Sequence, residues 1–256
     1  MPNKLKKFGV VILAAGQGKR MKSNLPKVAV PLKGRPMIEY LVKSCIESGI
    51  DKNPVVVVSS DNKDIISEIL KNYDCRYAIQ SEQLGTGHAL ACAKSELADA
   101  NKIISFYGDH PFVSPATVKK LAGCHNGVIT LMTVTVSNFD DWQKVFYNWA
   151  RIIRRDGQIK AIVEFKDAIE EIKKIKEVNP GFYCFDSQWL WQNIDNIKNN
   201  NVQQEYYLTD LIKFAFEQNQ RINSTEINIK EAVGINKPEE LAIAEKLILD
   251  SEASPE

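Results

Sequence analysis

The 256-residue sequence has few of the residues that build metal clusters or disulfide frameworks. It contains five cysteines, an odd number with no two in a CxxC spacing, and only three histidines. A structural zinc site is therefore not expected, because such sites need closely spaced Cys and His ligands. The cysteine pattern instead indicates free thiols in a reducing compartment, and we expect the protein in the cytoplasm.

The sequence also lacks a large excess of charge and long apolar runs. Its formal net charge is +1, so no broad basic surface for nucleic acid is expected. An anion site would be built locally, from a few cationic side chains and backbone N–H groups. No apolar run reaches the roughly 18 residues of a membrane span, so no membrane partner is expected. The first residues, MPNKLKKFGVVILAAG, superficially resemble a signal peptide, but the glycine-rich pattern that ends them favours a buried strand.

The amino-acid composition is typical of a globular protein. Hydrophobic residues make up 44% and charged residues 25% of the chain, close to ordinary usage. No repeat or low-complexity linker divides it, which predicts one domain over residues 1–250, with halves at about 1–127 and 128–250. The last residues, 251–256, are expected to be a disordered tail.

Apolar runs alternate with helical patterns through the first half. The expected strands there, at 10–14, 55–59 and 103–107, are almost continuously apolar, as in parallel strands that are covered on both faces. This alternation predicts an α/β fold with a doubly wound, mostly parallel, Rossmann-like sheet. Later segments alternate as in a mixed-sheet extension. The other expected elements are strands at 128–136 and 157–164 and helices at 36–48, 62–72, 87–97, 187–197, 206–218 and 238–249.

The most informative segment is LAAGQGKRMKSNLPK, residues 13–27, where the first strand gives way to a loop. Gly16 and Gly18 permit close approach of the backbone to a ligand, and such a loop can direct N–H donors at phosphate oxygens. Lys19, Arg20 and Lys27 add positive charge. The spacing matches neither a GxGxxG dinucleotide loop nor a GxxxxGK[ST] loop. The alternative is a surface turn with solvated cationic side chains.

Two further motifs carry polar groups that suit ligand binding, and the second of them directly follows an expected strand. In QSEQLGTGHA, residues 80–89, the Gln80 amide has both a donor and an acceptor and can read a pyrimidine edge. Thr86 alternatively caps the helix that follows, and His88 is expected to be a packed histidine rather than a ligand. In YGDHP, residues 107–111, Asp109 lies at a strand's carboxyl end, where open α/β sheets bind ligands. A carboxylate there suits Mg²⁺, although Asp109 alternatively caps a turn.

Together these motifs resemble those of the sugar nucleotidyltransferases, and most closely the uridyltransferase (pyrophosphorylase) domain of bacterial N-acetylglucosamine-1-phosphate uridyltransferases. The resemblance runs from about Val10 to Asn236. It implies a nucleotide-binding first half and a sugar-binding second half. It also implies catalytic roles for Arg20 and Lys27, and Mg²⁺ binding by Asp109 and Asn236. The nucleotide-binding residues it implies are Leu13, Ala14, Ala15, Gly16, Lys27, Gln80, Gly85, Thr86, Tyr107, Gly108 and Asp109.

The second half carries the implied sugar-binding residues, which the spacing alone would not have identified. These are Glu164 in VEFKDA, Asn179 in NPG, Thr209 in EYYLTD, and Ala150. At Ala150 the chain departs from the family, which has Tyr-Gly-Arg where this chain has Trp-Ala-Arg, so the identity of the sugar is open. The preceding aromatic segment, residues 139–149, fits either a lid over the sugar or local packing of an inserted turn or subunit contact.

The resemblance implies formation of UDP-N-acetylglucosamine and pyrophosphate from UTP and N-acetylglucosamine-1-phosphate, by Mg²⁺-assisted in-line displacement. Acetyltransferase activity is not expected, because the chain has no hexapeptide-repeat region. The alternatives are another sugar-1-phosphate such as glucose-1-phosphate, another nucleotide or an alcohol phosphate, and a non-catalytic nucleotide-sugar sensor. A homo-oligomer is compatible with the sequence, which does not define the oligomeric state.

Overall fold

The computed structural model describes residues 7–253 as helices on both faces of a mixed sheet. The strands in these residues are β1 (Phe8–Leu13), β2 (Pro31–Leu32), β3 (Arg35–Pro36), β4 (Val55–Val58), β5 (Arg76–Ile79), β6 (Lys102–Tyr107), β7 (Ile129–Thr135), β8 (Arg151–Arg155), β9 (Gln158–Val163), β10 (Glu177–Val178), β11 (Tyr183–Asp186) and β12 (Ile222–Glu226). The α-helices are α1 (Met37–Glu47), α2 (Lys63–Ile69), α3 (Thr86–Cys92), α4 (Pro115–Cys124), α5 (Glu170–Lys173), α6 (Ser187–Asn193), α7 (Asp210–Glu217) and α8 (Pro238–Ala253). The 3₁₀ helices are η1 (Lys19–Met21), η2 (Lys27–Ala29), η3 (Asp141–Phe146) and η4 (Ile194–Asn196).

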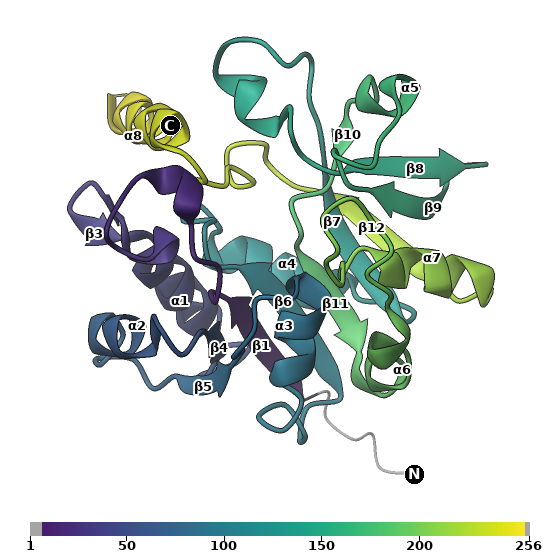
Figure 1. Ribbon diagram of the computed structural model, residues 1–256, viewed down its shortest axis with the longest axis horizontal. Helices are drawn as coiled ribbons and strands as arrows, with labels where there is room; N and C mark the ends of the chain where they lie inside the picture. The colour runs from purple at the N-terminus through teal and green to yellow at the C-terminus, as the bar shows by residue number, and fades with distance from the viewer. Residues whose placement is uncertain (1–6, 254–256) are drawn as a thin grey trace.

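The main sheet changes character halfway across. Its strand order is β5-β4-β1-β6-β11-β7-β10-β8-β9, with β12 beside β7. The four strands from β5 to β6 are parallel, whereas β11 runs antiparallel to both of its neighbours. In Figure 1 the parallel strands lie beside α1, α2 and α3, and the β8–β9 arm projects at the upper right near α5. The α/β fold with a parallel sheet and a mixed extension is therefore confirmed.

The sequence of β1 explains why both faces of the parallel part are covered. Its side chains alternate between faces. Val10 and Ile12 belong to the core beneath α1, α2 and α4, whereas Val11 and Leu13 belong to the core beneath α3, α6 and α7. Residues 10–12 are completely buried, so β1 is a central strand and its carboxyl end opens at the middle of the sheet edge.

The expected elements are found within a few residues of their predicted ends, but several others were not foreseen. The most consequential is β11, because it joins the parallel half to the rest of the sheet. The strand is only four residues long, too short for periodicity to distinguish from a loop. The polar strand β12 (INSTE) and helix α4 were missed as well.

The two ends of the described chain can be compared with the strand expected at the start and the disordered tail expected at the end. The apolar start forms the buried strand β1, as expected from its pattern, and residues 1–6 lie outside the described part. Helix α8 continues to Ala253, so the expected tail at 251–256 begins within a helix, and 254–256 lie outside the described residues. Within residues 7–253, no helix is both long and apolar enough to cross a membrane.

Candidate active site

The glycine-rich loop lies where β1 and β6 end side by side. The backbone N–H of Gly108 donates to Leu13 O, which ties the ends of these strands together. Gly18 has a φ of 65°, and a Cβ there would lie 2.4 Å from Lys27 Cβ. Only glycine fits this position without displacing the chain. The loop therefore brings Lys27 back against the end of the sheet.

Lys27 is the centre of a polar cluster in which Asp109 is buried, Lys27 and Asn236 are half-buried and Arg20 is exposed. Its Nζ lies 2.6 Å from Asp109 Oδ2 and 3.0 Å from Asn236 Oδ1. Arg20 donates from Nη2 to the same Asn236 oxygen at 3.0 Å. Burial would raise the pKa of Asp109, but the charges and hydrogen bonds of Lys27 and His110 lower it well below its ordinary value. Asp109 is therefore an ionised carboxylate at neutral pH.

His110 holds the other oxygen of Asp109. Its Nδ1 is 3.1 Å from Asp109 Oδ1 and 3.3 Å from Tyr107 O. Both neighbours are acceptors, so Nδ1 carries a proton and donates it. The His110 ring packs edge-on against Trp149 and Phe182, with centroid distances of 5.6 and 4.9 Å. His110 thus links the carboxylate to the aromatic segment.

Asp109 and Asn236 together suit a divalent cation. Each places one side-chain oxygen on the Lys27 ammonium group, so a positive charge already sits between two hard oxygen donors. Carboxylate and amide oxygens are ligands that Mg²⁺ accepts, and it usually retains waters or substrate phosphates as well. Residues 7–253 contain no group of three or more His, Cys, Asp or Glu placed to hold a metal. A cation here would therefore also depend on ligand oxygens.

A first cavity of about 290 Å³ opens over the ends of the parallel strands. Gln80, buried with 3% of its surface exposed, forms one side of it, and Gly85 leads into α3 beside it. A Cβ on Gly85 would lie 2.7 Å from Tyr206 O, so the loop packs closely there. The cavity is lined by Leu13, Ala14, Ala15, Gly16, Lys27, Val28, Gln80, Gln83, Gly85, Thr86, Ala89, Tyr107, Asp109, Glu205 and Asn236.

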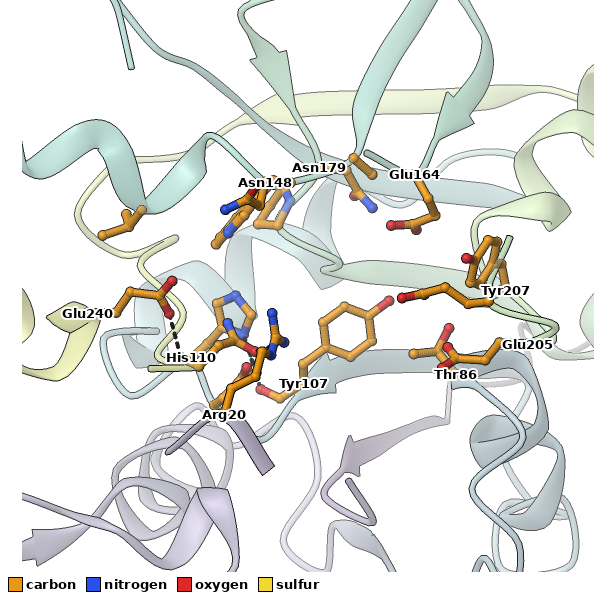
Figure 2. Close-up of a pocket in the computed structure, with 17 residues that line it drawn as sticks. Arg20, Thr86, Tyr107, His110, Asn148, Glu164, Asn179, Glu205, Tyr207 and Glu240 are labelled. Atoms are coloured by element: carbon orange, nitrogen blue, oxygen red, sulfur yellow. Dashed lines mark hydrogen bonds and ion pairs between the residues drawn. The ribbon is translucent and has the colours of Figure 1, made fainter. Parts of the chain in front are cut away.

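A second cavity of about 260 Å³ adjoins the first. Figure 2 shows Asn148, Asn179 and Glu164 along one wall, with Tyr107 below them. Tyr107, Asp109 and Asn236 line both cavities, as do Thr86 and Glu205. The polar cluster around Lys27 therefore lies where the two cavities meet.

Glu164 gives the second cavity a titratable group. It is half-buried, and its Oε1 accepts a hydrogen bond from Thr209 at 3.1 Å. Burial, supported by repulsion from Asp167 and Asp210, raises the pKa of Glu164 to about 7, although the Thr209 hydrogen bond opposes the rise. Thr209 itself is buried and does not line the cavity, so its contact with the cavity is only through Glu164.

Asn179 and Tyr107 are held by the turn before β11. Asn179 donates from Nδ2 to Tyr183 Oη at 2.6 Å and accepts from Gly181 N at 3.1 Å. Gly181 has a φ of 81°, and a Cβ there would lie 2.1 Å from Tyr107 Cε2. The Tyr107 ring packs directly against this glycine, and this contact helps to set the position of the ring between the cavities.

The aromatic segment 139–149 is fixed by one buried arginine. Arg151 is fully buried and donates to Lys173 O at 3.2 Å, to Tyr147 O at 2.7 Å and to Trp149 O. Its guanidinium group also stacks over Phe139, 4.6 Å from the ring centroid. Local packing thus accounts for most of the segment, while Trp149 and Asn148 reach the second cavity.

Most of the residues expected from the sequence meet at these cavities. Ala150 lines the second cavity, and its carbonyl accepts a hydrogen bond from Asn179 N. Arg20 also lines the second cavity rather than the first, and Gly108 lies behind the lining. The lining residues that were not foreseen include His110, Val145, Asn148, Gln203, Glu205, Tyr207 and Glu240.

Glu205 and Tyr207 could have been found from the sequence, whereas Glu240 could not. Glu205 and Tyr207 stand in the same EYYLTD motif as Thr209. Glu240 accepts from Asn236 N at 2.6 Å, a contact local to the start of α8, but its place beside Arg20 in the second cavity depends on how α8 returns to the β1 loop. No local pattern in the sequence reveals that return.

Comparison with known proteins identifies the family of the chain. A family model described as a MobA-like NTP transferase domain matches residues 10–165. The protein named Bifunctional protein GlmU from Caldicellulosiruptor saccharolyticus is 38% identical over 244 residues, which are 94% of this chain and 52% of that protein. Its namesake from Clostridium beijerinckii is 36% identical over 239 residues, 93% of this chain and 51% of that protein. The chain spans about half the length of these curated relatives.

A solved structure from Bacillus anthracis, named for a glucose-1-phosphate thymidylyltransferase and containing sucrose, has a similar fold. It superposes with a TM-score of 0.73, covering 95% of this chain and 96% of that one. At 17% sequence identity, the likeness concerns the fold alone.

Proposed function

The chain belongs to the MobA-like NTP transferase family, and on that premise we propose that it joins UTP to N-acetylglucosamine-1-phosphate, forming UDP-N-acetylglucosamine and pyrophosphate. The observation that carries the proposal is the pair of adjoining cavities with Lys27, Asp109 and Asn236 at their junction. The name of the relatives and the motif resemblance support the choice of nucleotide and sugar.

In this proposal the first cavity holds the nucleotide and the second holds the sugar. The backbone of residues 13–16 approaches the nucleotide closely because no large side chain intervenes, and Gln80 contacts the base. Glu164 and Asn179 offer hydrogen bonds to sugar hydroxyl and amide groups. Tyr107 separates the two ligands and lies against both.

The reaction needs no nucleophile from the protein. An oxygen of the sugar phosphate attacks the α-phosphorus of UTP, the bond between the α-phosphorus and the bridging oxygen breaks, and pyrophosphate leaves with the electron pair. We expect Lys27 to turn from Asp109 to the phosphate oxygens and Arg20 to contact the phosphates at the junction. Positioning and charge neutralisation then account for the rate.

Asp109 and Asn236 would hold Mg²⁺, which supplies further neutralisation of phosphate charge when bound. Contacts within the chain already position Asp109 and Asn236 in the absence of the cation. His110 fixes one carboxylate oxygen of Asp109, and Glu240 accepts from the backbone N–H of Asn236.

The test is pyrophosphate release with UTP and Mg²⁺, comparing N-acetylglucosamine-1-phosphate with glucose-1-phosphate. Rapid release with the acetylated sugar is the expected result. Release only with glucose-1-phosphate, or only with a thymidine nucleotide, would keep the chemistry and change the substrate. Binding of UTP by folded protein with no release for any sugar would favour the non-catalytic sensor.

A further inference from the structure

The side-chain nitrogen of Gln80 lies within hydrogen-bond distance of two groups of the protein. Nε2 donates to Gly85 O at 3.1 Å and lies 3.1 Å from His88 Nδ1. A primary amide has two N–H donors and one carbonyl acceptor. Once the two donors are occupied, only Oε1 remains for a ligand in the first cavity, which Gln80 lines.

The orientation of this amide follows from the chemistry of its neighbours. Gly85 O is a carbonyl and can only accept, and it already accepts from Ala89 N at 3.0 Å. The Gln80 atom beside it must therefore be the nitrogen, because two facing oxygens would repel. Rotating the amide by 180° would lose this hydrogen bond and place Oε1 against the carbonyl.

His88 completes the arrangement from the first turn of α3. For Nδ1 to accept from Gln80, the ring must carry its proton on Nε2. Nε2 lies 3.8 Å from Cys92 Sγ, one helical turn along, which can accept that proton weakly. His88 lines neither cavity among the described residues, so its effect on a ligand passes through Gln80.

We propose that His88 is a positioning residue that sets base specificity by fixing Gln80 as an acceptor toward the base. An acceptor that faces N3 of the base matches uracil, whose N3 carries a hydrogen, and opposes cytosine, whose N3 is itself an acceptor. This inference rests on the proposed function. It attributes the preference for uridine to the hydrogen bond between Gln80 and His88.

The test compares kcat/KM for UTP and CTP in three proteins: the unaltered chain, His88→Leu and His88→Asn. Leucine removes the acceptor, leaving one Gln80 donor unpaired and the amide free to move. We expect the UTP/CTP ratio to fall about 10-fold, a difference of ~1.4 kcal/mol, mainly through a higher KM for UTP. Asparagine can place Oδ1 near the ring-nitrogen position, and we expect it to keep the ratio within about 3-fold of the unaltered chain.

A spectroscopic measurement separates this role from simple packing. With only three histidines in the chain, the side-chain ¹⁵N signals of His88 are assigned by their loss in His88→Asn. The proposal predicts an unprotonated Nδ1 and a protonated Nε2. A protonated Nδ1, or an unchanged UTP/CTP ratio in folded His88→Leu, would overturn it.

The controls distinguish this proposal from the proposed function. If the unaltered chain releases pyrophosphate with UTP while His88→Leu keeps full selectivity, only the role of His88 fails. If the unaltered chain prefers CTP, the orientation of Gln80 is wrong. If no nucleotide reacts, the proposed function fails, and the ¹⁵N measurement still tests the Gln80–His88 contact.

Discussion

The two cavities that meet at Lys27 are built in different ways. The first is lined largely by two short segments, 13–16 and 80–89, whose small residues bring backbone close to a ligand. The second is lined by side chains from many separate parts of the chain, including Glu164, Asn179 and Tyr207. Backbone geometry therefore shapes the first cavity, which we propose holds the nucleotide, whereas side-chain chemistry shapes the second, which we propose holds the sugar. We expect substitutions at the junction of the cavities to affect both substrates, and substitutions in one cavity to affect only the substrate that it binds.

The largest effect is expected at the junction, from Lys27→Ala. Loss of the cation facing the phosphates should lower kcat by about 10³-fold, measured by pyrophosphate release. The variant should also lose stability, because Asp109 would keep a buried charge without its ammonium partner.

A second variant separates these two consequences. In Lys27→Ala with Asp109→Asn, the buried charge pair is removed as a unit, so thermal denaturation should recover part of the lost stability while activity stays absent. Near-normal activity in the single Lys27→Ala variant would show that the phosphates do not lie at the junction.

Gly181→Ala tests the wall between the cavities. The added methyl group would collide with Tyr107 and occupy a backbone conformation that L-residues avoid. We expect a loss of at least ~2 kcal/mol in the free energy of unfolding, with higher KM values for both substrates. Gly123→Ala is the matched control, because that glycine is helical and faces open space. Urea denaturation should show Gly123→Ala at least as stable as the unaltered chain, and equal stability of the two variants would contradict the account.

Glu164→Gln tests the sugar side alone through its pH dependence. Because the pKa of Glu164 is raised from 4.5 to about 7, the folded protein binds the proton more tightly than the unfolded chain. Its contribution to stability is therefore fully present below about 4.5 and is lost as the pH rises through about 7. The same ionisation creates a carboxylate acceptor for sugar hydroxyls, so kcat/KM for the sugar phosphate should rise through about pH 7.

The glutamine variant should lose the Glu164 contribution to both profiles while leaving the KM for UTP within about 2-fold, since an amide does not titrate in this range. Titration of the sugar phosphate itself serves as a built-in control, because it remains in the variant. Profiles that coincide for the two proteins would mean that Glu164 does not face the sugar.

The smallest effect is expected from Ala150→Gly, which restores the residue typical of the family that the sequence resembles. Ala150 is buried at the edge of the second cavity, and its carbonyl is held by Asn179 N. Removing one methyl group should change the KM for the sugar phosphate by about 3-fold or less and leave that for UTP unchanged. A gain of a different sugar substrate would show that this methyl group decides sugar choice.

The same difference between the cavities explains what the sequence could predict. The residues around Leu13 and Asp109 end or follow buried strands that the sequence predicts, so their meeting at one sheet edge follows from a parallel sheet. The strand before Gln80, β5, is only partly buried and was not foreseen. Arg151 and His110 could not be given their roles, because these depend on contacts with distant segments. Arg151 holds the carbonyl groups of the aromatic segment, and His110 joins Asp109 to Trp149.

The central claim is that one oxygen of the sugar phosphate attacks the α-phosphorus of a nucleotide held beside it. ³¹P NMR with N-acetylglucosamine-1-phosphate carrying ¹⁸O on its non-bridging phosphate oxygens tests this directly. The account predicts UDP-N-acetylglucosamine with ¹⁸O in the bridge between its two phosphorus atoms, and unlabelled pyrophosphate in equal amount. Label in the pyrophosphate, or consumption of UTP without a nucleotide sugar, would contradict it.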